Sequence, residues 1–271
     1  MKIAISFSHD EVKGFKFGSW PFGKPVMFSH VYFFDGLLID TGHKHVRKEV
    51  TQAVNALPVD QIFITHHHED HTGNLGHLQE ILNSPTYASS RCVEMMQTAP
   101  PVSLVQRLTW GRAKANLNIK PVDREIRTSN HQLEIIHIPG HAPDMVCLHL
   151  AERGWLFSAD LWVSEYIRYF LEEESMKQQI DSIRKVLKYD FDVLFCGHNP
   201  QFKGGKQKLR NKLQFFEDFY GKVAELNKRG QTPNAIFRAL ELKEAWPLRI
   251  VSNGRLSTFN MVKSVIRDES A

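Results

Sequence analysis

A short apolar run that ends in a cluster of histidines constrains this chain more than any other feature. Residues 61–65 have the pattern of a buried strand, and they lead directly into the run His-His-His-Glu-Asp-His at 66–71. In an extended loop, residues two apart face the same side, so His66 and His68 can hold one metal ion. Asp70 and His71, at the turn into the next helix, can reach a neighbouring ion. Four donors cannot complete two zinc sites, so the remaining ligands must come from elsewhere in the chain.

Three further donors follow predicted strands in the same way. His141 follows a strand at 133–138, Asp160 follows one at 155–158, and His198 follows one at 193–196. Ligands in sheet proteins commonly bind just beyond strand ends, so we expect these side chains to converge at one edge of a sheet. The sequence therefore predicts a two-metal site with the ligands His66, His68, Asp70, His71, His141, Asp160 and His198. We expect ordinary loop or hydrogen-bonded roles for His9, His43, His45, His67, His77, His131, His137 and His149.

The rest of the pattern indicates an α/β body followed by helices. Strands are expected at 26–34 and 37–40, joined by a turn at Asp35-Gly36, and helices at 43–56 and 74–82. Residues 91–125 suggest an irregular helical insertion interrupted by Pro100-Pro101, and a strand at 145–150 and a helix at 175–188 follow. Beyond about residue 205, amphipathic helical segments at 206–228, 233–242 and 257–267 predict a helical subdomain. We therefore expect a catalytic domain over 1–204 and a helical C-terminal subdomain over 205–271.

Composition narrows the classes of protein without selecting one. The chain has 271 residues, 42% of them hydrophobic, which is typical of a globular protein. No apolar stretch approaches the roughly 18 residues of a membrane helix, and the first residues lack the pattern of a secretory signal, so we expect a cytoplasmic protein with no membrane partner. Three widely spaced cysteines indicate no disulfide framework. The net charge of +4 does not by itself imply a nucleic-acid partner.

The chain resembles the metallo-β-lactamase-fold hydrolases over roughly residues 25–205. It carries their five ordered motifs, namely Asp40 in Ile-Asp-Thr-Gly, the His-x-His-x-Asp-His run, and the single residues His141, Asp160 and His198. The resemblance implies a four-layer αββα sandwich with the site at one edge of two packed sheets. It further implies that His66, His68 and His141 bind a first metal, that Asp70, His71 and His198 bind a second, and that Asp160 bridges them. Asp40 would orient the histidine loop from outside the ligand set.

This resemblance implies metal-dependent hydrolysis. Two ions about 3.5–4 Å apart can share a water and make hydroxide available at neutral pH, with Asp70 positioning it or accepting its proton. The metals are expected to be Zn²⁺, with Mn²⁺ or Fe²⁺ as alternatives. Zinc β-lactamases generally lack the bridging aspartate, and the flavodiiron branch has Glu at the position of His68, so both branches are disfavoured. The layout is nearest to the group of glyoxalase II and the lactamase-like endoribonucleases, although no glutathione-binding basic motif is recognisable.

Three reactions remain open at this point. The leading hypothesis is cleavage of a small ester, thioester or lactone, because the aromatic segment 162–170 follows Asp160 and suits an acyl group. Its Tyr166, Arg168 and Tyr169, together with His30, are candidate substrate-binding residues. The second hypothesis is phosphodiester cleavage in RNA or DNA, which draws on a basic run of Lys203, Lys206, Lys208, Arg210 and Lys212. A mononuclear iron persulfide dioxygenase is the third, and the oligomeric state is not predicted.

Overall fold

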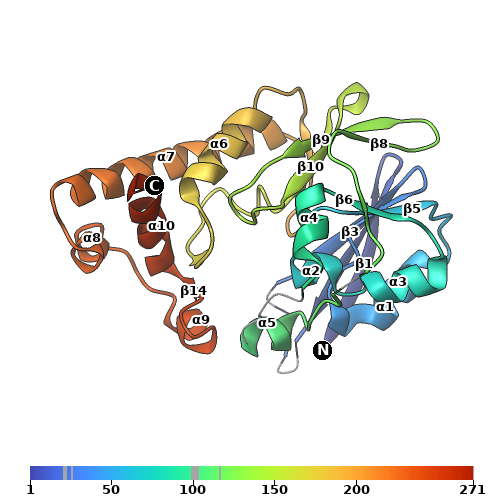
Figure 1. Cartoon of the computed structure of the whole chain (residues 1–271), viewed down its shortest axis with the longest axis horizontal. Coiled ribbons are helices and arrows are strands. Elements are labelled where there is room, and N and C mark those ends of the chain that lie inside the picture. Colours follow the sequence, from blue (N-terminus) through green and yellow to red (C-terminus); the bar gives the residue numbers. More distant parts are fainter. Residues whose placement is uncertain (21–22, 26, 99–103, 116, 271) are drawn as a thin grey trace.

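The computed structural model describes residues 1–20, 23–25, 27–98, 104–115 and 117–270 (Figure 1). Two sheets pack face to face, and helices cover the outer face of each. The four layers confirm the expected αββα sandwich, with a helical region following it in the chain. Within the described residues, no helix has both the length and the apolar character needed to cross a membrane.

The first sheet comes mainly from the N-terminal half. Its strands lie in the order β1-β2-β3-β4-β5-β6-β7. Their bounds are β1 Lys2–His9, β2 Val12–Ser19, β3 Ser29–Phe34, β4 Leu37–Ile39, β5 Gln61–Ile64, β6 Thr86–Ala88 and β7 Lys120–Pro121. From β4 to β7 neighbouring strands are parallel, whereas β1 to β4 pair antiparallel. The parallel part carries the chain from strand ends into the loops at one edge, where the histidine cluster lies.

The second sheet comes from the later part of the body. Its strands lie in the order β13-β11-β10-β9-β8. Their bounds are β8 Glu125–Arg127, β9 Gln132–His137, β10 Val146–Leu150, β11 Trp155–Ala159 and β13 Val193–Cys196. The inner faces of the two sheets share a core that includes Phe34, Phe63, Leu148 and Phe157, all nearly inaccessible to solvent. Burial of apolar surface between the sheets is thus the main force that brings the strand ends of both to one edge.

The helices of the body cover the first sheet. They are η1 Lys44–Val46, α1 Arg47–Val54, α2 Glu69–Thr72, α3 Leu75–Leu82, α4 Ser90–Met95 and α5 Leu104–Thr109. Val50 of α1 and Leu78 of α3 are buried against Leu38 and Ile62 of the sheet. A further 3₁₀ turn, η2 Ala151–Arg153, links β10 and β11.

The second sheet is covered by α6 Met176–Val186 and α7 Gly205–Lys228. The later elements are a small pair of strands, β12 Phe170–Leu171 with β14 Leu256–Ser257, and the helices α8 Pro233–Ala239, α9 Trp246–Val251 and α10 Thr258–Ser270. Apolar residues of α6, α7 and α10, such as Ile183, Phe216 and Val262, share one buried cluster with Leu194 of β13. The helical region therefore packs directly on the outer face of the second sheet, as Figure 1 shows at its left side.

Several local expectations need correction. The second N-terminal strand, β2, was not expected, because its two glycines dilute the alternating pattern, yet it pairs with both β1 and β3. The helix expected over 43–56 begins as a 3₁₀ turn, and helix α9 was not expected. The segment expected to be an irregular helical insertion over 91–125 also supplies the edge strand β7. Val26 and the pair Pro100-Pro101, named above, lie outside the described residues.

Candidate metal centre

The loop after β5 holds its histidines through contacts with neighbouring strands. Residues 66–68 lead from the strand to α2, with His68 in an extended conformation, and α2 then places Asp70 and His71 in its single turn. Asp40, just after β4, accepts hydrogen bonds from Thr65 N (2.9 Å) and from His71 Nδ1 (2.7 Å). Asp40 has a left-handed backbone conformation with a φ of 62°. Its carboxylate therefore ties both ends of the loop to the sheet.

Three imidazole nitrogens converge at the first cluster. Nδ1 of His68 lies 3.2 Å from Nε2 of His66 and 3.1 Å from Nε2 of His141. Tetrahedral zinc with nitrogen ligands at 2.0–2.1 Å would separate those nitrogens by about 3.3 Å. In their neutral forms, three rings that face one point bring lone pairs together, which a shared cation would relieve. The spacing and the donor type both fit a metal ion.

A second cluster lies beside the first and contains two histidines and two carboxylates. Asp70 Oδ2 lies 3.3 Å from His198 Nε2 and 3.6 Å from His71 Nε2. Asp160 Oδ1 lies 3.4 Å from the same nitrogen of His71. The possible ligand atoms of this cluster all lie within 4.8 Å of one another, as do those of the first. The structure thus brings together all seven side chains singled out from the sequence.

Asp160 lies between the two clusters. Its Oδ2 is 3.0 Å from His198 Nε2 in the second cluster and 3.5 Å from His141 Nε2 in the first. A shift in register between Phe157 and Ala159 bends the end of β11, and Ala159 has a φ of 45°. Bulges of this kind redirect the side chain that follows, here towards the gap between the clusters.

Hydrogen bonds from outside the clusters determine which ring nitrogen faces inward. The carbonyl of Phe28 can only accept, so His198 donates to it from Nδ1 (2.7 Å). His71 donates from Nδ1 to Asp40, and His141 Nδ1 lies 3.3 Å from Glu174 Oε2. In the neutral form each of these three rings therefore presents the lone pair of Nε2 to its cluster. Partners of this kind are what ligating histidines usually require.

The charges in the two clusters are poorly compensated by hydrogen bonds. Within the described part of the chain, His71 Nε2 and Asp160 Oδ1 are buried and make no hydrogen bond, and their ion-pair contact with each other is long, at 3.4 Å. Leaving such atoms unpaired costs about 1–3 kcal/mol each. A divalent cation between them would satisfy both. The residues present therefore fit a bound metal ion, because it would satisfy these two buried atoms.

Burial and the neighbouring carboxylates displace the pKa values in opposite directions. Burial lowers the pKa of His66 and His68 well below their ordinary value, which keeps these rings neutral and able to ligate. Burial also disfavours the charged form of His198, but Asp160 and Asp70 outweigh it and raise its pKa to about 9. The pKa of Asp160 falls well below its ordinary value despite burial, because His198 and His71 lie against it. Asp160 is therefore ionised.

A glycine allows the second cluster to close. A Cβ atom on Gly197 would lie 2.4 Å from Asp160 Oδ1 and 2.7 Å from His71 Cε1. Both separations are far below van der Waals contact, so any larger residue there would displace one of the two donors. The glycine before His198 is thus part of the geometry of the site.

A family comparison agrees with this geometry. The family model of the metallo-beta-lactamase superfamily matches residues 25–198. The chain belongs to this superfamily. The matched segment begins between β2 and β3 and ends at His198, so it contains all seven clustered residues.

Relatives within the superfamily are distant. A beta-lactamase-like protein 2 homolog from Drosophila melanogaster is 26% identical over 60% of this chain and 54% of its own length. A hydroxyacylglutathione hydrolase from Bdellovibrio bacteriovorus is 25% identical over 53% of this chain and 51% of its own length. An atrochrysone carboxyl ACP thioesterase from Aspergillus fumigatus is 22% identical over 65% of this chain. The matches span about half the length of these relatives.

Solved structures of the superfamily share the fold along nearly the whole chain. A metallo-beta-lactamase family protein from Thermus thermophilus has a TM-score of 0.66 at 18% identity, covering 97% of this chain and 95% of its own. A beta-lactamase domain protein from Burkholderia ambifaria has a TM-score of 0.68 at 14% identity, covering 96% and 86%. Superfamily members are generally hydrolytic enzymes, and this chain has the His and Asp groups that can bind their metals.

Two supporting residues were missed from the sequence. Glu174 precedes α6 and is held by Leu171 N and Gln179 Nε2 while it faces His141. Asp144 accepts from His67 N (2.8 Å) and contacts His67 Nδ1 (2.8 Å), so the His67 side chain is anchored there. The only local signal for either residue is the position of Asp144, three residues after His141.

Lys212 belongs to the basic run that suggested nucleic-acid binding, and the structure places it differently. Its side chain is 1% exposed and donates from Nζ to the carbonyl of Leu161 (2.6 Å). Lys206 donates to the carbonyl of Tyr189, and Lys208 donates to Gln201 Oε1. The run therefore does not form one exposed basic face. Lys212 instead supports the loop that carries Asp160.

The candidate substrate residues divide into two groups. His30 is 3% exposed and donates from Nδ1 to the carbonyl of Gly197 (3.1 Å), next to His198, and burial lowers its pKa to about 4. It is therefore a neutral support of the His198 loop. Tyr166 is 67% exposed and stacks edge-on against Phe215, and Arg168 is exposed. Tyr169 is half-buried, and burial raises its pKa. Within the described chain, none of the hydrogen bonds or ion pairs joins these last three to the clusters.

Proposed function

We propose that this protein is a metal-dependent hydrolase that cleaves a small thioester, ester or lactone with two divalent cations, Zn²⁺ in the first instance. His66, His68 and His141 would hold one cation, and Asp70, His71 and His198 the other, with Asp160 between them. The observation that carries the proposal is the convergence of two sets of metal-ligating atoms, in which the buried His71 Nε2 and Asp160 Oδ1 make no hydrogen bond. A cation shared by these donors would satisfy both atoms.

When bound, two cations would supply a Lewis acid and a nucleophilic water at neutral pH. The chain's own residues would perform the remaining tasks. Asp70 lies at the edge of the second cluster, and its carboxylate would accept a proton from the attacking water. Asp40 and Glu174 would keep the ligating rings in position, because each holds a ring through its Nδ1. His30 would support the His198 loop as a neutral hydrogen-bond donor.

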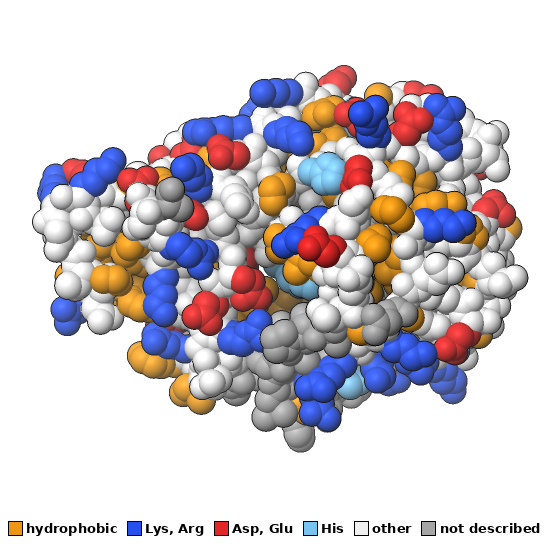
Figure 2. All heavy atoms as spheres, in the orientation of Figure 1, with side chains coloured by type: hydrophobic (Ala, Val, Ile, Leu, Met, Phe, Trp, Pro, Cys, Tyr) orange, Lys and Arg blue, Asp and Glu red, His pale blue; other side chains and the backbone are white. Residues whose placement is uncertain are grey.

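The thioester is the favoured substrate class within this proposal. Two of the relatives are named as a hydroxyacylglutathione hydrolase and an ACP thioesterase, and each name describes removal of an acyl group from a carrier. Figure 2 shows a hollow near the centre of the face in view, with histidine side chains at its edge. A substrate could therefore reach histidines from this side. Tyr166, Arg168 and Tyr169 remain candidates for contacts with the acyl group or its carrier.

Metal analysis and a substrate panel would test the proposal together. Protein purified without chelator should contain about two metal ions per chain and hydrolyse acyl thioesters in preference to phosphodiesters. Asp160→Ala should lower the metal content towards one ion and reduce turnover by at least about 100-fold. Asp190→Ala, which alters a fully exposed aspartate, should retain both.

Two results would contradict the proposal. The first is full turnover by Asp160→Ala with an unchanged metal content. The second is turnover confined to phosphodiesters, or oxygen consumption with a persulfide and a single bound iron, which would favour one of the alternative reactions.

A further inference from the structure

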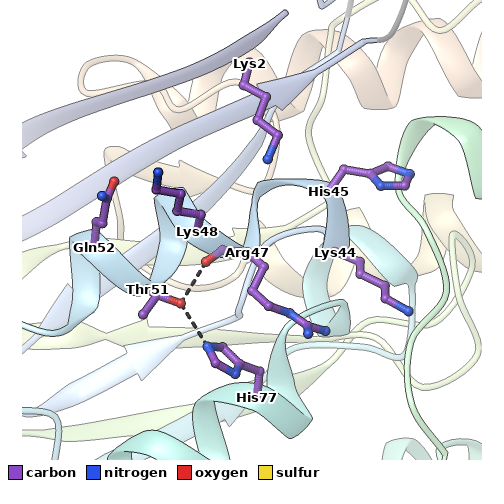
Figure 3. Close-up of a pocket in the computed structure, with 8 residues that line it drawn as sticks. All are labelled: Lys2, Lys44, His45, Arg47, Lys48, Thr51, Gln52 and His77. Atoms are coloured by element: carbon purple, nitrogen blue, oxygen red, sulfur yellow. Dashed lines mark hydrogen bonds between the residues drawn. The ribbon is translucent and has the colours of Figure 1, made fainter.

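A pocket of about 610 Å³ lies between the start of α1, the helix α3 and Lys2 at the start of β1 (Figure 3). It continues into a second hollow of about 230 Å³ that shares Lys44, Arg47 and His77 with it. We call the two hollows together the basic pocket. Its lining consists of Lys2, Lys44, His45, Arg47, Lys48, Thr51, Gln52, Gly73, Gly76, His77, Glu80, Arg112 and Lys114. None of the seven clustered residues of the metal centre is among them.

Most of the cationic side chains that line the basic pocket form no ion pair among the described residues. Lys2 pairs with Glu49 (3.2 Å), and Lys114 pairs with Glu80 (3.1 Å). Within the described residues, no ion pair involves the other four cationic side chains, Lys44, Arg47, Lys48 and Arg112. Like charges gathered in a concave surface repel one another and focus a positive potential there. Figure 2 shows Lys and Arg side chains gathered along the lower edge of the molecule, in the region where Figure 1 places α1.

These cations also occupy the positive end of a helix. Arg47 and Lys48 form the first turn of α1, and Lys44 begins the 3₁₀ turn that leads into it. The residue before α1 is Val46, which supplies no capping hydrogen bond from its side chain. Helix N-termini favour anions and disfavour cations by about 0.3–1 kcal/mol each. Glu49 supplies one negative charge in the same turn, and a bound anion would add further favourable charge at this helix end.

Tertiary contacts hold the basic pocket open and ordered. Thr51 Oγ1 donates to the carbonyl of Arg47 (2.8 Å), so it accepts from His77 Nε2 (3.0 Å), which links α1 to α3. Figure 3 shows this link, with Arg47 and Lys44 extending on the same side of the turn as His77. Gly111 has a φ of 89°, and a Cβ there would lie 2.7 Å from Lys44 Cβ. That glycine lets the loop carrying Arg112 approach the Lys44 stem.

We propose that the basic pocket binds a compact ligand carrying two or more phosphate groups, such as a nucleoside diphosphate. Its volume lies within the range of small-molecule sites, roughly 300–1,000 Å³. Arg47 and Arg112 can each offer two parallel N–H donors to a phosphate, and Lys44 adds a point charge. A nucleic acid would instead need cations spread along an extended track. The basic run on α7 does not supply one, because Lys212 and Lys206 are used inside the protein.

Calorimetric titration with ADP and with inorganic pyrophosphate would test this proposal on the intact protein. Both should bind at one site per chain. Lys44→Gln/Arg47→Gln should weaken the binding of each by about tenfold or more. Lys203→Gln/Lys222→Gln removes the same number of charges from exposed positions on and beside α7, and it should change affinity less than threefold. Arg112→Gln provides an independent single variant if the first double variant loses its native circular dichroism.

The controls also separate this site from the metal centre and from a nucleic-acid surface. Asp160→Ala should retain pyrophosphate binding, because the basic pocket does not use that residue. Loss of binding in Asp160→Ala would place the phosphates at the metal centre and overturn the proposal. Equal weakening by the two double variants would also overturn it, as would tight binding of single-stranded RNA with no measurable binding of ADP or pyrophosphate.

Discussion

Replacing Asp40 by Asn should weaken metal binding while leaving the backbone intact. Asn has nearly the same size as Asp and tolerates the left-handed conformation, here a φ of 62°. The carboxylate of Asp40 accepts from Thr65 N through Oδ1 and from His71 Nδ1 through Oδ2. An amide has only one acceptor oxygen. In either orientation its NH₂ group therefore faces Thr65 N or His71 Nδ1. One hydrogen bond is then lost, or His71 takes the tautomer that carries a proton on Nε2, where the cluster needs a lone pair.

The magnitude follows from the bond that is lost. A buried hydrogen bond to a charged group is worth about 1.5–3 kcal/mol, which corresponds to roughly 10- to 150-fold in an equilibrium constant. Mutation of residues that orient metal ligands typically costs 10–100-fold in metal affinity. We therefore expect zinc to bind the cluster containing His71 about 10–100-fold more weakly in Asp40→Asn. Competition with a chromogenic chelator would measure this, with the other cluster as an internal reference.

Asp35→Asn is the matched control for this experiment. Asp35 also has a positive φ of 45° and accepts hydrogen bonds from Thr128 Oγ1 (2.6 Å) and Asn130 N (2.8 Å). It lies at the turn between β3 and β4, and neither of these partners belongs to the two clusters. It should leave both zinc affinities unchanged. The reasoning would be refuted if Asp40→Asn kept its native circular dichroism and bound both ions with wild-type affinity, or if Asp35→Asn weakened binding equally.

Two further substitutions test other parts of the site. Gly197→Ala should lower the metal occupancy measured by atomic emission, because its methyl group would lie 2.4 Å from Asp160 Oδ1. Gly221→Ala should leave the occupancy unchanged, because Gly221 has open space around it. Equal metal occupancy in the two variants would contradict this reasoning. Burial lowers the pKa of Lys212 from 10.5 to about 8. Below pH 8 its buried charge therefore destabilises the folded state by about 3 kcal/mol. This destabilisation disappears as the pH rises from 8 to above 10.5, because the lysine is then neutral in both the folded and the unfolded state. In metal-free protein, the free energy of unfolding of the wild type should therefore rise by about 3 kcal/mol relative to that of Lys212→Met between pH 7.5 and pH 10.5. Denaturant titration at a series of pH values would measure this difference. If the free energies of the two proteins changed in parallel with pH, the Lys212 ammonium would not be buried against the carbonyl of Leu161.

Local pattern was enough to predict which side chains the structure brings together in the two clusters. His66 and His68 follow a buried strand, and His141, Asp160 and His198 each follow another, so strand periodicity alone placed them at strand ends. Packing of the two sheets then decided that these ends share one edge. The same local signals located β5, β13 and α7 within one or two residues. Helices and strands can be predicted in this way because the spacing of apolar side chains that defines each of them involves only neighbouring residues in the sequence.

Contacts between distant segments could not be predicted from such signals. Glu174 faces His141 only because α6 packs on the second sheet, and no spacing in the sequence joins the two. Lys212 lies in a run that resembles a solvated helix face, yet the packing of α7 turns it inward to Leu161. The basic pocket likewise combines Lys2 with residues of α1, α3 and the 111–114 loop. The sequence by itself determined which chemical groups stand at the strand ends, because that depends on local periodicity. Only the tertiary structure decided which distant groups hold those donors or gather into a second site, because that depends on how sheets and helices bury their apolar faces.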